Sequence, residues 1–344
     1  MLDQKTYDAV TARLQKYGYQ LFAQGDTLYH TQVFRPTKEQ IDVDSVLAAE
    51  LPACFIASDN LAIADEAYLN HLQRTVKSLY NGTTFAFRRL EVEPLRLWCD
   101  LGYFYDNLLS CAALDAELRA NNGLALREQY YRTIAPVDAL FHGRGRSAAV
   151  GVAVLTVFNN NGRYEAILGR RSQHAATYQQ AYHVVPAFIF QPSTPTLRYP
   201  LEWSIRHQIY REFLEELFGL DELLNPDRPD YFYQHPALQG LQARLADGRA
   251  TLQLTGISFN LRNLRPEVCA VLIIHDEAWC QQARLENGDD TFKMAAETEH
   301  FLRVPIETDE AIHRVLPAPH LQMPPQGATA FWLGVAAARQ QLNS

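Results

Sequence analysis

The chain has 344 residues, which at about 150 residues per domain corresponds to roughly two domains. Hydrophobic residues make up 47% and charged residues 20%, which is typical of a packed globular protein and excludes a disordered or collagen-like chain. Lysine and arginine number 31 against 39 aspartate and glutamate, a net charge of −8, so a long nucleic acid is not an expected partner. A small phosphorylated ligand is compatible with this charge if a cation or a few arginines neutralise it.

The cysteines and the apolar runs predict the cellular compartment of the protein. The five cysteines form no Cys-x-x-Cys pair, and several lie in apolar runs, so we expect buried free thiols in a reducing cytoplasm. The N-terminus is polar without a following apolar stretch, which predicts no signal peptide. No run of 18 apolar residues occurs, so we expect no membrane-spanning segment.

Residues 1–141 are predicted to form an α+β domain. Apolar residues recur at helical spacing near the start, and an alternating segment around Gly25-Asp26 indicates a hairpin. The expected elements are a helix over 7–17, a hairpin over 19–34, a helix over 60–80, a strand over 83–88 and a helix over 97–120. We find no motif in this part of the chain that indicates a chemical role.

Residues 142–147, His-Gly-Arg-Gly-Arg-Ser, are predicted to be a linker between two domains. Two glycines and two arginines in so short a segment are also of the kind that contacts a phosphate. A solvated connector is the favoured interpretation.

Residues 148–344 are predicted to form a second domain. Strands are expected over 148–158, 163–170, 181–191, 251–261 and 268–275, with helices over 200–218 and 328–341. Strands on both sides of one polar helix, with another helix at the end, predict an α/β fold, an α/β/α sandwich around a mixed sheet.

The helix over 200–218 carries an unusual group of charges. Glu212 stands three and four residues before Glu215 and Glu216, so the three carboxylates project from one face, beside Arg211. At about 5 Å and an effective dielectric constant of about 20, each pair of carboxylates would repel by roughly 3 kcal/mol. They also lie near the C-terminal end of the helix, where the macrodipole favours cations. The group therefore favours a counterion such as Mg²⁺, and the alternative is a solvated acidic face in which Arg211 pairs with Glu215.

This segment resembles the signature of the Nudix hydrolases, G-x5-E-x7-R-E-U-x-E-E-x-G-U, in which U is aliphatic. The match covers Arg211 to Glu216, and the following glycine comes one residue late, at Gly219. Upstream, Pro186 ends a strand where the family has Pro-Gly-Gly. The order of predicted strands and helices agrees with the family over residues 146–340.

The first half of the signature departs from the family. Leu197 and Trp203 occupy the places of its first glycine and first glutamate, and Ala187 and Phe188 replace the two glycines after the proline. The proline also lies 25 residues before Arg211, against about sixteen in the family. We therefore expect an expanded loop before the helix, without the backbone freedom that glycine provides.

The resemblance implies roles for individual residues. It implies that Glu212, Glu215 and Glu216 bind Mg²⁺ or Mn²⁺ with help from the carbonyl of Ala187, while Arg211 orients the carboxylates. In many relatives a later loop supplies a general base, for which residues 286–299 offer Glu297 or Glu299. Arg170 and Arg171, at the end of a predicted strand, are candidates for contacting phosphate, with surface charge as the alternative.

The leading hypothesis is a metal-dependent Nudix hydrolase that cleaves the diphosphate of a nucleoside diphosphate linked to another group. The alternative is a Nudix-type domain that senses a nucleotide or nucleotide sugar without turnover, and a scaffold protein is the third interpretation. The intact glutamates favour the enzyme, and the altered loop favours the sensor. The expected ligand is a small nucleotide, no membrane or long nucleic acid is expected as a partner, and the chain could form a homodimer.

Overall fold

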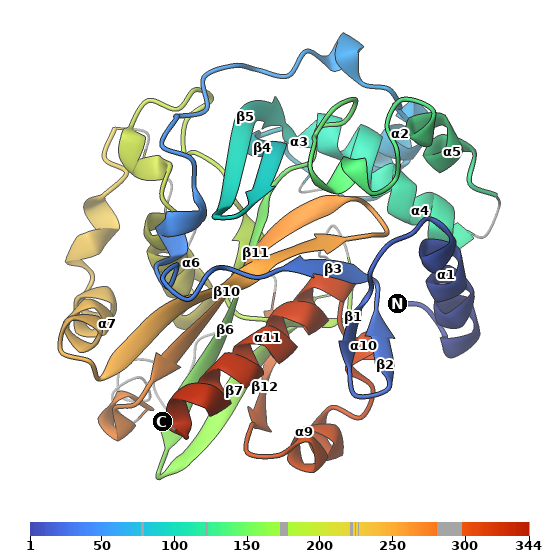
Figure 1. The fold of residues 1–344 in the computed structure, drawn as a ribbon. Helices are drawn as coiled ribbons and strands as arrows, with labels where there is room; N and C mark the ends of the chain where they lie inside the picture. Colours follow the sequence, from blue (N-terminus) through green and yellow to red (C-terminus); the bar gives the residue numbers. More distant parts are fainter. Residues whose placement is uncertain are drawn as a thin grey trace.

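The structure is a computed structural model that describes residues 1–76, 79–120, 123–172, 178–220, 223, 225, 227–280 and 298–343. Within these residues the protein is a mixed α/β protein with one main eight-stranded mixed sheet and two small hairpins (Figure 1). The strands are β1 Phe22–Gln24, β2 Thr27–Tyr29, β3 Thr31–Phe34, β4 Thr83–Val92, β5 Leu95–Tyr103, β6 Gly151–Asn160, β7 Arg163–Arg171, β8 Tyr182–Val184, β9 Ala187–Ile189, β10 Ala250–Asn260, β11 Arg265–Ile274 and β12 Thr298–Pro305.

The helices surround this sheet. They are α1 Gln4–Lys16, α2 Glu66–Thr75, α3 Phe104–Asn107, α4 Ala113–Ala120, α5 Ala125–Tyr131, α6 Ile205–Phe218, α7 Pro236–Ala246, α9 Asp309–Val315, α10 Pro319–Gln322 and α11 Pro325–Leu342, with one π-helical turn at Leu108–Ala112. In the described part of the chain, none of the helices combines the length and the apolarity that crossing a bilayer requires.

The main sheet has the order β12-β7-β6-β11-β10-β3, with β8 paired to β7 and β9 paired to β6. The central pair, β6 and β11, is parallel, and the remaining pairs are antiparallel. Both central strands are almost fully buried, which is why their sequences are continuous apolar runs without alternation.

Alternate residues of the central strands pack against different helices. Val152 and Val154 belong to the same buried cluster as Phe213 of α6. Leu155, one residue further along β6, belongs to a second cluster with Phe331 of α11. Because successive side chains of a strand point to opposite faces, α6 and α11 cover opposite faces of the sheet. Figure 1 shows α11 (red) lying across the strands.

Several predicted elements are confirmed and one is wrong. The first helix, the hairpin at Gly25-Asp26 and the helix ending at Gly219 are present. The helix expected over 97–120 is wrong for its first seven residues, which belong to β5. There, Leu95, Leu97, Cys99 and Leu101 are buried at a spacing of two, which is the period of a strand and not of a helix. The strand expected over 181–191 is divided into β8 and β9.

Residues of the predicted N-terminal domain contact the main sheet directly. Strand β3 pairs with β10 as its outermost strand. On α5, the guanidinium of Arg127 donates hydrogen bonds to the carbonyls of Leu261, at 3.1 Å, and Arg262. Asp115 of α4 forms a buried ion pair with Arg262 at 2.6 Å. The two parts of the chain are therefore joined by a strand pairing and by buried polar contacts, and whether they fold as separate domains stays a prediction.

Residues 142–147 are only partly solvated: His142 and Arg144 are exposed, whereas Gly143, Arg146 and Ser147 are buried. The Arg146 side chain is buried, and it donates hydrogen bonds to the carbonyls of His142, at 3.0 Å, and Ala139, at 2.6 Å. The Gly145 carbonyl accepts a hydrogen bond from the amide of Ala62 at 2.8 Å. The interpretation of this segment as a solvated connector is wrong at Arg146, because the side chain and the backbone are both held by neighbouring segments.

This packing predicts resistance to proteolysis. Under native conditions, we expect trypsin to cut after neither Arg144 nor Arg146 before the whole chain unfolds, because cleavage requires a segment to leave its hydrogen bonds. Mass spectrometry of a digestion time course measures this. Early cleavage after either arginine, leaving a soluble C-terminal fragment with an intact β-rich circular dichroism spectrum, would instead support two domains joined by an accessible linker.

Candidate functional site

Helix α6 is fixed at both ends and along one face. Ser204 caps its N-terminus by accepting a hydrogen bond from the His207 amide, and Asp44 accepts two more from the amides of Ile205, at 2.6 Å, and Arg206, at 3.2 Å. Gly219 ends the helix in a left-handed conformation, as predicted. The predicted apolar face, Ile205, Ile209, Phe213 and Leu217, is buried against the sheet. The opposite side of the helix therefore presents the charged residues.

Arg211 lies between two of the three predicted carboxylates. Its Nη2 atom donates a 2.7 Å hydrogen bond to Oε1 of Glu212, and its Nε atom lies 3.7 Å from Oε1 of Glu215. The exposed fractions of the side chains are only 4% for Arg211, 12% for Glu212 and 14% for Glu215. In this semi-buried setting the guanidinium offsets the repulsion between the two carboxylates. The predicted pairing of Arg211 with Glu215 is present, and the solvated acidic face that accompanied it as an alternative is not.

Glu215 and Glu216 also hold the loops that flank the helix. Oε1 of Glu215 accepts a 2.6 Å hydrogen bond from the amide of Leu223, in the loop after α6. Oε1 of Glu216 accepts a 2.9 Å hydrogen bond from the amide of Ala187, at the start of β9. The structure thus brings Glu216 and Ala187 together across 29 residues of sequence, although Ala187 and Phe188 stand where the signature it resembles has two glycines.

The donor set was predicted to hold Mg²⁺. In the described part of the chain, no three histidine, cysteine, aspartate or glutamate side chains are placed to hold a metal ion together. Mg²⁺, however, is commonly bound through one or two carboxylates, with water and substrate phosphate completing its shell. Glu212 and Glu216, one helical turn apart, fit such a site in their chemistry. Glu212 also contacts Arg211, and Glu216 contacts the amide of Ala187, while Glu215 contacts both Arg211 and Leu223. Metal binding stays a prediction.

The other predicted residues gather at the edge of the sheet formed by β7 and β12. Arg170 donates a 2.6 Å hydrogen bond to the side chain of Gln180, which in turn donates one of 2.7 Å to Glu299. Burial shifts the pKa of two groups, His183 and Glu267, and the positive charge of Arg171 acts to lower the pKa of both. Arg170 and Glu299 therefore form one group through Gln180, whereas the three glutamates of α6 contact Arg211, Leu223 and Ala187. Glu297 lies outside the described residues.

Glu267 is a buried carboxyl group that the sequence analysis missed. It stands at the start of β11 opposite Gly151, and its carboxylate occupies the space that a Cβ atom would need at that glycine. Burial raises its pKa to about 7, although Arg265 and Arg171 act in the opposite direction. The signal in the sequence that could have identified Glu267 was a single glutamate near the start of an otherwise apolar strand. A carboxyl group that changes charge near neutral pH is suited to proton transfer.

No protein-family model matches the chain, and no curated protein matches its sequence. Function is therefore inferred from the residues described above.

The raised pKa of Glu267 predicts how stability depends on pH. Because the folded state binds this proton more tightly than the unfolded chain, the carboxyl group stabilises the fold below its ordinary pKa of 4.5, and this stabilisation is lost as the pH rises through about 7. Glu267→Gln is neutral at every pH. Between pH 5 and pH 8, its free energy of unfolding should therefore rise relative to that of the wild type by roughly 1–3 kcal/mol.

Denaturant unfolding at several pH values measures this difference. Glu128→Gln is the matched control, because Glu128 is an exposed helical glutamate and its loss should not alter the pH profile. If Glu267→Gln and the wild type lost stability in parallel between pH 5 and pH 8, Glu267 would not be the titrating group.

Proposed function

We propose that this chain is a Nudix-type hydrolase that cleaves the diphosphate linkage of a nucleoside diphosphate bonded to another group. The observation that carries the proposal is the hydrogen bond between Glu216 and the Ala187 amide, beside the Arg211 ion pairs. It holds the acidic helix against the segment that follows Pro186, the two parts that the resemblance assigns to one site. The position of α6 and α11 on opposite faces of the mixed sheet supports an α/β/α sandwich of the Nudix type.

From these contacts we propose different roles for the acidic residues. We assign Glu212 and Glu216 to holding Mg²⁺ together with the substrate diphosphate. When bound, the cation neutralises the phosphates and favours attack by water on phosphorus. Arg211 and Glu215 are positioning residues: Arg211 fixes the carboxylate of Glu212, and Glu215 fixes the loop at Leu223.

The group at the edge of the sheet is proposed to contact the substrate. Arg170 and Arg171 are cations that suit phosphate oxygens, and the hydrogen-bond chain from Arg170 through Gln180 places Glu299 in the same group. Glu299 is the described candidate for a general base. Glu267, near Arg171, is a second carboxyl group suited to proton transfer.

A sensor without turnover is the second candidate function. It is favoured by the ion pairs themselves, because Arg211 compensates two of the three carboxylates without a metal ion. It is also favoured by the lack, in the described residues, of three acidic or metal-ligating side chains around one point. In this case the chain would bind the nucleotide and transmit its presence through the N-terminal part.

The cellular compartment of the protein is proposed from its cysteine thiols. All five cysteines are free, and four of them, Cys99, Cys111, Cys269 and Cys280, are buried as expected. This supports a reducing compartment, so we propose the cytoplasm. A small nucleotide ligand and a homodimer remain part of the proposal.

Single substitutions at the three glutamates test the enzyme hypothesis. With Mg²⁺ or Mn²⁺, Glu216→Gln and Glu212→Gln should each lower kcat by about 10²–10³, the usual effect of removing one electrostatic contact to the transition state. Nucleotide affinity should change much less, because the metal acts mainly on charge that develops during the reaction. Glu215→Gln should have a smaller effect on kcat, since Glu215 acts through Arg211 and Leu223.

The measurement combines product release with calorimetric binding for ADP-ribose, dinucleotide polyphosphates and nucleotide sugars. Glu128→Gln, an exposed glutamate of α5, is the control and should behave as the wild type. Binding by the wild type without product release, for every compound and with both metals, would contradict the hydrolase and leave the sensor.

A further inference from the structure

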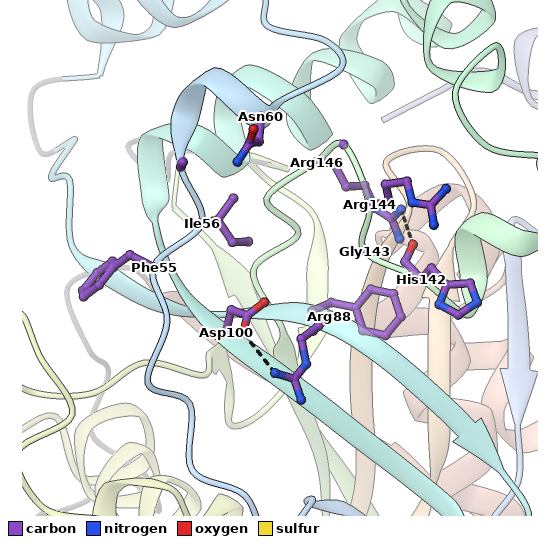
Figure 2. Close-up of a pocket in the computed structure, with 12 residues that line it drawn as sticks. Phe55, Ile56, Asn60, Arg88, Asp100, His142, Gly143, Arg144 and Arg146 are labelled. Atoms are coloured by element: carbon purple, nitrogen blue, oxygen red, sulfur yellow. Dashed lines mark hydrogen bonds and ion pairs between the residues drawn. The ribbon is translucent and has the colours of Figure 1, made fainter.

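A separate cavity lies far along the chain from the acidic helix, where residues 142–146 meet the β4–β5 hairpin and the segment of residues 55–60. Its volume is about 420 Å³, within the range of roughly 300–1,000 Å³ that is typical of small-molecule sites. Figure 2 shows Arg88, Arg144 and Arg146 around it, with Phe55 and Ile56 from the facing segment. We call this cavity the Arg144 pocket.

The lining of the Arg144 pocket carries an excess of positive charge. Asp100 is the acidic residue in the lining, and it lies 3.4 Å from Arg88, which also pairs with Glu50 at 3.0 Å. Arg144 is exposed, and its side chain makes no hydrogen bond or ion pair with the described residues. The cation of Arg88 is therefore compensated, whereas that of Arg144 is directed to no carboxylate of the described chain.

Arg146 is a buried cation with neutral partners. Only 1% of the residue is exposed, and its guanidinium donates to the Tyr130 hydroxyl and to the carbonyls of His142 and Ala139. Its Nε atom is buried without a hydrogen-bond partner in the described structure. A buried guanidinium that lacks a carboxylate has a large desolvation cost, which a bound anion would offset.

The backbone of this segment has room only for glycine at two positions. A Cβ atom at Gly143 would collide with the carbonyl oxygen of Phe87, and Gly145 has a φ of +73° with Ala62 only 2.8 Å from where its Cβ would lie. These two glycines let the segment pass close to its neighbours while it holds Arg144 and Arg146 at the same cavity. The alternation of glycine and arginine thus places Arg144 in the exposed lining of the cavity and Arg146 in its buried wall.

Apolar side chains form part of the remaining wall, beside Asn60 and His142. Phe55 is 38% exposed and stacks on Tyr103 with ring centroids 5.3 Å apart, and Ile56 follows it in the same segment. An exposed aromatic ring beside a cationic wall suits a ligand that has a planar group at one end and an anion at the other.

From these observations we propose that the Arg144 pocket binds a phosphate monoester with a planar group, of the size of a nucleoside monophosphate. The phosphate pairs with the exposed Arg144, the buried cation of Arg146 adds positive potential from within the wall, and the planar group lies against Phe55. This site is distinct from the acidic helix, and it does not depend on the proposed hydrolase activity.

Calorimetry on the full chain in EDTA tests this site without divalent metal. AMP, GMP, CMP and UMP are the probes, with the corresponding nucleosides and inorganic phosphate for comparison. The monophosphates should bind more tightly than the nucleosides, and Arg144→Gln should weaken their binding by about tenfold or more, as expected for one charge-assisted hydrogen bond. Phe55→Ala should weaken nucleotide binding and leave the binding of inorganic phosphate unchanged.

Two controls separate this site from the rest of the molecule. Arg132→Gln makes the same change of charge at an exposed arginine outside the pocket and should leave affinity unchanged. Glu216→Gln should also bind the monophosphates as the wild type does, so failure here is distinguishable from failure of the hydrolase hypothesis. The proposal is overturned if no monophosphate binds at millimolar concentration, if nucleosides bind equally well, or if Arg132→Gln weakens binding as much as Arg144→Gln. In each case Arg146 would serve only to join neighbouring segments.

Discussion

The candidate site depends on how three carboxylates are accommodated on one semi-buried helix face. Glu212, Glu215 and Glu216 lie within two turns, and carboxylates about 5 Å apart repel by roughly 3 kcal/mol per pair at an effective dielectric constant of about 20. Arg211 compensates Glu212 and Glu215, and the amides of Leu223 and Ala187 bind Glu215 and Glu216. These partners offset the repulsion between the carboxylates, and the two amide hydrogen bonds fix the loops on both sides of α6.

The remaining architecture keeps this helix in place. The parallel pair β6 and β11 is buried on both faces, so α6 and α11 must cover opposite sides of it. Asp44, from the N-terminal part, binds two amides at the start of α6 and thereby couples that part to the acidic helix. An N-terminal segment that holds the helix of the candidate site is able to influence it, which is relevant to both the enzyme and the sensor.

Local patterns predicted the parts of the fold that depend on local physics. The apolar spacing and Gly219 identified α6, and continuous apolar runs identified β6 and β11. The first part of the helix expected over 97–120 is instead β5, because Leu97, Cys99 and Leu101 alternate and the segment pairs with β4. The pairing of β3 with β10 joins residues more than 200 positions apart, and no local pattern contains such information.

In the candidate site, too, some features could be predicted from the sequence and others depend on tertiary packing. The charges of α6 were visible in the sequence, and so was the role of Arg211 as partner of Glu215. The burial of Glu267 against Gly151 and of Arg146 beneath Tyr130 depends on tertiary packing. A glutamate in an apolar strand and an arginine after a glycine were the local signs, and solvated surface positions would give the same signs.

The most direct test of the central claim is the position of a metal ion in the presence of a diphosphate. Crystals soaked with Mn²⁺ and a non-hydrolysable nucleoside diphosphate analogue would locate the metal through its anomalous scattering. We expect the Mn²⁺ peak beside the carboxylates of Glu212 and Glu216, with the ligand phosphates completing the shell and Glu215 still paired with Arg211. A diphosphate bound with no anomalous peak at α6, or with Mn²⁺ held elsewhere, would contradict the assignment of this helix to metal-dependent hydrolysis.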